Sequence, residues 1–549
     1  MESSFPGDGE GTPSRASEHK RGGWITFPFM LATVACMTLG IGGWTNNLIV
    51  YMIEEFNVES IDAVQIWNIV NGSTIMFTLL GAIIADSFLG NFAVLWISSV
   101  ISFLGIILLL LGSTIDTMRP PPCVVTSPST KCITASKLQF AGLYVGMGLA
   151  SVAGAQRVIS PLGADQFDKP KHQVTFFNWI IFSMYVAYCV TATVIIYVEN
   201  DVSWGLGFGL SAGATVVGLA ILFSGCRFYR YVKPKGSPFL GLARVVVAAI
   251  RKRNVSVPIR SEDYYRGADD RGTIAATTLT GFKCLNRAAV KAEGDTKPDG
   301  SIAKPWKLCT MRQVEDLKIV IRLVPLWSTG ILLSTPLAIQ ASLFVLQALT
   351  MDRRLGPHFT VPAASMLIFL LIFTPLTIIF LDRLLYPAWQ KLTGRFPPPL
   401  QRVGIGHVVV ALSMVVSALV ESKRLKEARK HRSMSVFWLV PQLALIGIGE
   451  GFQLPGNSTL FYQEFPAELK STGTALVSLF VGLAYYVSVL LVSVVRRSTR
   501  WLPNDINDGR MDNLYWLVFG LAAVNFVFYL VCAWLYKYRG LARVAAENY

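Results

Sequence analysis

Charged side chains are scarce in this sequence, and their scarcity argues against a water-soluble fold. Only 15% of the 549 residues are charged, whereas 52% are hydrophobic; a soluble domain carries about 25% charge. Lipid is the alternative solvent, and it admits only helices of about 20 apolar residues or closed barrels. The alternating strands of a barrel are missing and long apolar runs are frequent. We therefore expect an all-α membrane protein.

Several chemical signatures are also missing. No Gly-rich phosphate loop of the form GxxxxGK[ST] occurs, which argues against a pump with its own ATPase. The eight cysteines lack metal-type spacing, and the five histidines form no grouping with a nucleophile. We therefore expect no metal, no cofactor, no catalytic residues and no enzyme. Cys123 and Cys132 could pair if their loop faces an oxidising space, and free thiols fit equally well.

The apolar runs fall into two groups of six. This arrangement predicts twelve transmembrane helices in two six-helix bundles, the major facilitator architecture, with a central site between the bundles. The expected parts are a disordered N-terminal tail (1–23), an N-terminal bundle (24–225), a basic cytoplasmic linker (226–315), a C-terminal bundle (316–537) and a C-terminal tail (538–549). Within the linker we expect a short amphipathic helix near Phe239–Ile250.

The net charge of +15 reflects the linker and the loops, so we expect a lipid surface rather than nucleic acid as the partner. Residues 226–315 contain 18 Lys+Arg and 8 Asp+Glu. Positive residues favour the cytoplasmic side, so we expect both termini inside. Residues 421–432, with six Lys+Arg, are expected to form an outer loop and argue against this orientation.

Ionisable groups inside spans are costly, so they are candidate functional residues. Glu450 lies between glycines in the tenth span and could relay protons, gate transport or serve only a helix partner. Arg157, in the fourth span, could bind an anion, pair with Glu450 as a gate or extend to the interface. Asp86, at the end of the second span, is expected to hold a turn.

Uncharged polar residues inside spans are weaker candidates. Each could hydrogen-bond a solute, although bonds between helices are the commoner use. The candidates of this kind for solute binding are Asn46, Asn47, Gln340 and Asn457.

Several motifs resemble the plant nitrate/peptide transporters, the proton-dependent oligopeptide transporter family of the major facilitator superfamily. They occur in family order from about residue 24 to residue 540. The motifs are Thr45-Asn-Asn47-Leu-Ile-Val-Tyr51, Ala85-Asp86-Ser-Phe-Leu-Gly90, Gly163-Ala-Asp165-Gln-Phe167-Asp168, Leu400-Gln-Arg402-Val-Gly404-Ile-Gly406 and Phe461-Tyr462-Gln-Glu-Phe-Pro466. The resemblance implies a transporter, with Asp165 in a structural role like that of Asp86.

The sequence departs from that family where proton coupling resides. The ExxER acids and arginine of the first span fall at Val34, Met37 and Thr38, so Phe27 to Ile53 holds no charged residue. The family's fourth-span lysine falls at Gln156, before Arg157. A histidine that some nitrate-transporting members use falls at Leu337. These alignments imply that Gln156 and Leu337 line the solute site.

Loss of ExxER, with Gly23-Trp-Ile-Thr-Phe-Pro-Phe29 and Ile53-Glu-Glu-Phe-Asn57, resembles the nitrate excretion transporters. This resemblance implies low-affinity efflux of nitrate, or of chloride, by alternating access with weakened or altered proton coupling, at the plasma membrane rather than the vacuolar membrane. The alternative is a transporter of a larger plant metabolite such as a glucosinolate, glycoside or alkaloid. A sensor without transport, kinases acting on the linker and a homo-oligomer stay open.

Overall fold

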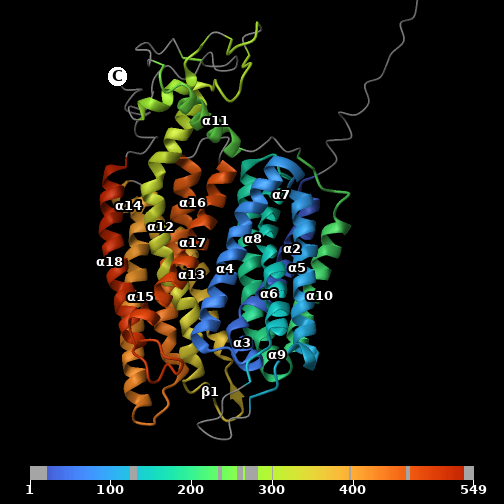
Figure 1. The fold of residues 1–549 in the computed structure, drawn as a ribbon, viewed down its shortest axis with the longest axis vertical. Coiled ribbons are helices and arrows are strands. Elements are labelled where there is room, and N and C mark those ends of the chain that lie inside the picture. Colours follow the sequence, from blue (N-terminus) through green and yellow to red (C-terminus); the bar gives the residue numbers. More distant parts are fainter. Residues whose placement is uncertain are drawn as a thin grey trace, which may run out of the picture.

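The computed structural model describes residues 22–123, 133–232, 238–255, 264–265, 282–292, 294–298, 301–394, 397–464 and 470–536. Within these residues, twelve helices are long and apolar enough to cross a membrane. They stand side by side along the long axis of the molecule, with the first six in one bundle and the last six in the other (Figure 1). The structure therefore confirms the all-α membrane fold.

The N-terminal bundle contains helices α2 to α10. Their bounds are α2 (Phe27–Thr45), α3 (Leu48–Phe56), α4 (Ser60–Ile84), α5 (Asn91–Thr114), α6 (Lys137–Ser151), α7 (Ile159–Ala164), α8 (Pro170–Val190), α9 (Ile196–Asp201) and α10 (Trp204–Ser224). Four of the six spans are assembled from shorter pieces, because α2 runs on into α3, and irregular turns interrupt or end three others.

The C-terminal bundle follows helix α11 (Pro238–Arg251) and a 3-10 segment at Lys283–Ala289. Its helices are α12 (Met311–Leu349), α13 (Ile368–Phe380), α14 (Tyr386–Thr393), α15 (Pro399–Ala428), α16 (Val440–Glu464), α17 (Lys470–Ser498) and α18 (Met511–Leu535). The strands β1 (Arg354–Leu355) and β2 (Phe359–Thr360) form an antiparallel hairpin. This hairpin lies at the end of the molecule opposite α11 (Figure 1).

Irregular turns mark several spans. Segments with π-helical bonding occupy Ala85–Leu89, Thr191–Ile195 and Leu381–Leu385, and a 3-10 segment occupies Val152–Val158. Such turns inside helices are often found at functional sites or at bends. The 3-10 segment carries Arg157, one of the candidate residues from the sequence.

The linker contains a small folded unit. Helix α11 matches the amphipathic helix expected near Phe239–Ile250, and its Val245 and Ala248 pack on Val290, Cys309 and residues of α12. Lys252 and Asp295 form a buried ion pair at 2.7 Å, and the same Lys252 amine donates to the Val290 carbonyl. Burial raises the pKa of the Cys309 thiol to about 11. Helix α12 begins at Met311, within the range expected to be linker.

The expected outer loop at residues 421–432 is wrong in its first part. Helix α15 continues to Ala428, so Glu421 and Arg424 are helical, and their side chains are 0% and 2% exposed. They fit because Arg424 makes two bonds with the Glu421 carboxylate, at 2.7 and 2.8 Å. Paired in this way, two charges can be buried where single ones could not.

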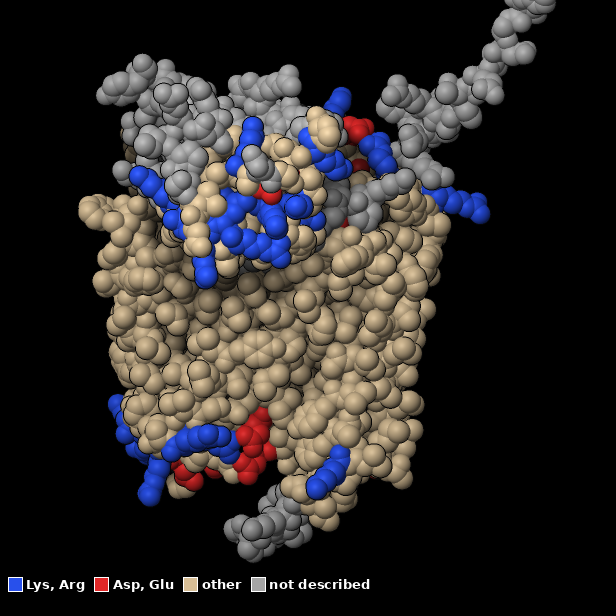
Figure 2. All heavy atoms as spheres, turned by 45° about the horizontal axis from the view of Figure 1, so that its top comes forward, with Lys and Arg blue, Asp and Glu red and all other residues tan. Residues whose placement is uncertain are grey.

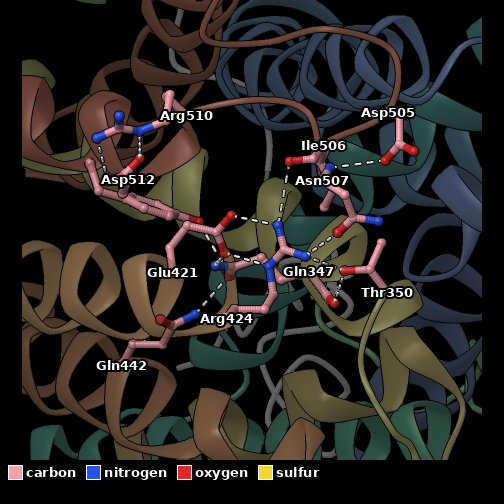
Figure 3. Close-up of polar contacts among 11 residues, drawn as sticks. Gln347, Thr350, Glu421, Arg424, Gln442, Asp505, Ile506, Asn507, Arg510 and Asp512 are labelled. Carbon is pink, nitrogen blue, oxygen red and sulfur yellow. Dashed lines mark hydrogen bonds and ion pairs between the residues drawn. The ribbon is translucent and has the colours of Figure 1, made fainter. Parts of the chain in front are cut away.

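The Arg424 guanidinium connects three parts of the C-terminal bundle (Figure 3). It donates to the Thr350 hydroxyl beyond α12, to the Asn507 side chain before α18 and to the Ile506 carbonyl. The Gln347 amide bonds Glu421 at 2.7 Å, and Gln442 of α16 bonds Gln347 at 2.9 Å. We call these residues the Arg424 network.

Other expected features fall on residues that the structure does not describe. These include Met1 to Arg21 of the N-terminal tail and the C-terminal tail 538–549. Cys123 is disulfide-bonded, whereas Cys132 lies outside the described residues.

We predict that Glu421→Gln destabilises the protein by about 3–5 kcal/mol, because it leaves Arg424 buried without its counter-charge. Thermal unfolding of the purified protein in detergent, followed by tryptophan fluorescence, measures the loss. The control is Glu427→Gln on the same helix, whose pair with Lys430 is partly exposed and worth less than about 1 kcal/mol. Equal stability of the two variants would refute a stabilising role for the Arg424 network.

Candidate transport site

Arg157 is an exposed arginine in the middle of the N-terminal bundle. The 3-10 segment that carries it presses against α4, because a Cβ at Gly154 would overlap the Thr74 carbonyl. Thr78 holds the segment by donating to the Gly154 carbonyl at 3.1 Å. Gln156 and Val158 are buried on either side, so Arg157 alone points away from the packed core. A guanidinium in this position can bind an oxyanion through its planar fork.

Glu450 lies in α16 of the other bundle and is half-buried. Its carboxylate accepts a hydrogen bond from the Thr374 hydroxyl of α13 at 3.1 Å. Gly447, one turn earlier, and Gly451, the next residue, allow α13 to pack closely against α16. The residue therefore sits on a helix pair that is held tightly within the C-terminal bundle.

The charges of Arg157 and Glu450 act on the same aromatic residues. Both lie within electrostatic range of the hydroxyls of Tyr185 on α8 and Tyr485 on α17. Because these four residues come from both bundles, they define a site at the centre of the molecule. Among the described ion pairs there is no bond between Arg157 and Glu450, so the predicted gate pair is not formed in this conformation.

The polar candidates in the first span serve packing within the N-terminal bundle. Asn47 is buried and donates to Asn200 of α9 at 2.7 Å. Asn46 ends α2, and its backbone N–H bonds the Gly42 carbonyl. Met37, at one of the lost ExxER positions, accepts a hydrogen bond from Ser99 through its sulfur. The first span, from Phe27 to Ile53, thus packs against its neighbours without any charged side chain.

The remaining candidates have separate surroundings. Gln340 is fully buried and accepts from Ser417 of α15 at 2.8 Å, while Leu337 packs on the main hydrophobic core. Asn457 is half-buried in α16. Asp86 lies in the π-helical turn after α4, and Asp165 follows α7. These positions fit structural roles for both aspartates.

A second set of polar contacts joins the bundles at the end opposite the linker. Arg496 of α17 forms ion pairs with Asp62 of α4 and with Glu59, the latter at 2.7 Å. Gln65 bonds Ser493 at 3.1 Å, and Asn68 bonds Ser342 at 3.2 Å. We call these contacts the distal clasp. They hold the two bundles together on one side of the central site.

Sequence reasoning missed three charged features. Arg496 and the Glu421–Arg424 pair lie in the terminal turns of spans, where basic residues are typical of loops. Glu199 of α9 is 1% exposed and was not among the predicted site residues. Acids and bases spaced three apart, as Glu421 and Arg424 are, could have indicated a helical pair.

Comparison with known proteins agrees with this architecture. Residues 92–507 match the model of the POT family. The chain is 48% identical to Protein NRT1/PTR FAMILY 2.7 of Arabidopsis thaliana, over 98% of each chain, and 46% identical to Protein NRT1/PTR FAMILY 2.6, over 100% of this chain and 99% of that one. It is 35% identical to Protein NRT1/PTR FAMILY 2.13, over 95% and 88%.

Solved structures share the fold at low sequence identity. An auto-inhibited POT family peptide transporter aligns with a TM-score of 0.66 at 17% identity, covering 93% of this chain and 97% of its own. The POT family transporter PepTSo gives 0.65 at 17% identity, with the same coverage.

We predict that Glu450→Gln changes the pH dependence of transport, because it removes the titratable carboxylate at the central site. Thr374→Val removes the hydrogen bond to that carboxylate and is expected to alter the same profile less. Initial rates in proteoliposomes across a pH series measure both. Thr377→Val is the control, since its hydroxyl bonds only the Phe373 carbonyl. An unchanged profile in Glu450→Gln would exclude a proton role.

We also predict that Arg496→Gln opens the distal end more often. The lost pairs are partly exposed and worth about 1 kcal/mol together, so the open population should rise about fivefold. Distances between spin labels at Val202 and Asp508 report this opening. The control is Arg497→Gln, which removes an exposed charge one position away. A distance distribution equal to that of the control would contradict the clasp.

Proposed function

Because this chain belongs to the POT family of membrane transporters, which are not enzymes, we propose that it carries a small inorganic anion, nitrate first and chloride second. The observation that carries the proposal is Arg157, an exposed cation at the central site. No described ion pair neutralises it, so it is available to a solute anion. Arginine is well suited to this task because it stays charged and matches planar oxyanions.

We propose that movement is outward. The first span has no charge between Phe27 and Ile53, so the usual proton-coupling acids are missing. An inside-negative membrane potential drives an anion out by roughly 2.3 kcal/mol per 100 mV, so export needs no proton gradient. This proposal includes the plasma membrane as the location and cytoplasmic termini, on the side of the basic linker.

Alternating access would follow from a change in the contacts between the bundles. The distal clasp holds the end opposite the linker shut, and Arg157 and Glu450 lie apart at the centre. In the alternate state the clasp would separate and the charges of the central site would approach each other. Rocking of two bundles around a fixed site is the usual motion of this architecture.

A larger plant metabolite is the second candidate. The observation that favours it is a group of three half-buried tyrosines. Tyr185 and Tyr485 lie near both central charges, and Tyr188 lies near these two tyrosines. Aromatic faces provide contact area for a glycoside or alkaloid, which a nitrate ion does not need.

The proposal is tested by flux in liposomes under a set membrane potential. Nitrate is expected to leave along the potential, chloride more slowly, and without acidification of either compartment. A glucosinolate in large excess should leave nitrate flux unchanged. Flux of the glucosinolate with no flux of nitrate would replace the first candidate by the second.

We predict that Arg157→Ala lowers nitrate flux by at least about tenfold, since a charge-assisted bond to an anion contributes about 1.5–3 kcal/mol. Arg157→Lys keeps the charge but not the planar fork and should be intermediate. Arg322→Ala is the control, because that arginine is also exposed within a span but lies near the linker end of α12. Near-normal flux in Arg157→Ala, at equal protein level, would exclude its role.

A further inference from the structure

The folded unit of the linker has a basic surface that lies outside the candidate transport site. We propose that this surface docks on the anionic phospholipid headgroups of the leaflet on the linker side. It is formed by Arg244 and Arg251 of α11 and by Lys304, Trp306 and Lys307 before α12. We call these five residues the basic-aromatic patch.

The patch is built around Trp306, which is 40% exposed. The Arg244 guanidinium lies over the Trp306 ring at 5.9 Å from its centroid. Arg251 donates to the Trp306 carbonyl at 3.3 Å. Two segments that are distant in the sequence are thereby held as one surface, and the exposed lysines Lys304 and Lys307 flank the ring.

The described part of the linker unit is strongly positive. Among the described residues from Pro238 to Thr310, the only acidic side chain is Asp295, which is buried and paired with Lys252. Figure 2 shows Lys and Arg side chains gathered at the linker end of the molecule, directly beside the broad uncharged wall of the helices. Cations at that level meet phosphate and carboxylate groups of lipid.

Helix α11 also has apolar side chains on two faces. Val245 and Ala248 face the core of the linker unit, whereas Val246 and Ile250 are 40% and 61% exposed. Exposed aliphatic groups and a tryptophan among cations are typical of helices that lie in a membrane interface. A soluble acidic partner would match the charge of the patch, but it would not explain why Val246 and Ile250 are exposed on the same helix.

The test uses the full chain in nanodiscs of phosphatidylcholine with or without phosphatidylserine. Hydrogen–deuterium exchange of residues 238–255 and 301–310 is expected to be at least about fivefold slower with phosphatidylserine. The variant Arg251→Gln/Lys304→Gln/Lys307→Gln should lose this difference. The matched control, Lys426→Gln/Arg429→Gln/Arg432→Gln, removes three exposed charges at the opposite end and should keep it.

A second measurement needs no variant. Salt at 0.5 M or above should abolish the protection in the wild-type protein, because screening shortens the reach of the headgroup charge to a few ångströms. Equal exchange in both lipid compositions would overturn the proposal. So would protection that survives high salt, or protection conferred by a soluble polyanion in discs without phosphatidylserine.

Discussion

A charge inside a bilayer needs a partner or water, and the arrangement of this molecule depends on that constraint. Glu421 and Arg424 satisfy it by pairing in the dry interior of one bundle. Arg496 satisfies it across the boundary between bundles, with Asp62 and Glu59. Arg157 is exposed at the centre, where a solute or water can reach it. The same physical requirement is therefore met in three ways: by a buried structural pair, by an ion pair between bundles, and by exposure of a candidate binding group.

The ion pairs of the distal clasp are more exposed than the Glu421–Arg424 pair, so breaking them costs less free energy. The clasp is partly exposed, so it can open and reform at small cost. The Glu421–Arg424 pair at the heart of the Arg424 network is buried, and the arginine is fully bonded, so the network keeps α12, α15 and the segment before α18 together. A transporter needs both, because rigid halves are what allow a weak contact between them to act as a switch.

Much of this fold follows from local sequence. Twelve apolar runs predict twelve spans because lipid leaves the backbone no other choice. Arg157 and Glu450 could be found as isolated charges within such runs. The partners of polar residues could not be found, since Asn47 meets Asn200 and Arg424 meets Asn507 at separations of 153 and 83 residues. The six Lys and Arg of residues 421–432 predicted a loop, because the sequence does not show that Arg424 is buried against Glu421 within α15.

The Arg424 network also bears on how the chain is made. Arg424 enters the membrane with Glu421 one turn away, so the ion pair can form inside a single helix as α15 is inserted. Its contacts with Ile506 and Asn507, and the bond of Tyr515 to Gln347, require the segment before α18 and the last helix itself. The contacts of the Arg424 network can therefore be completed only after α18 has been made and has packed against α12 and α15.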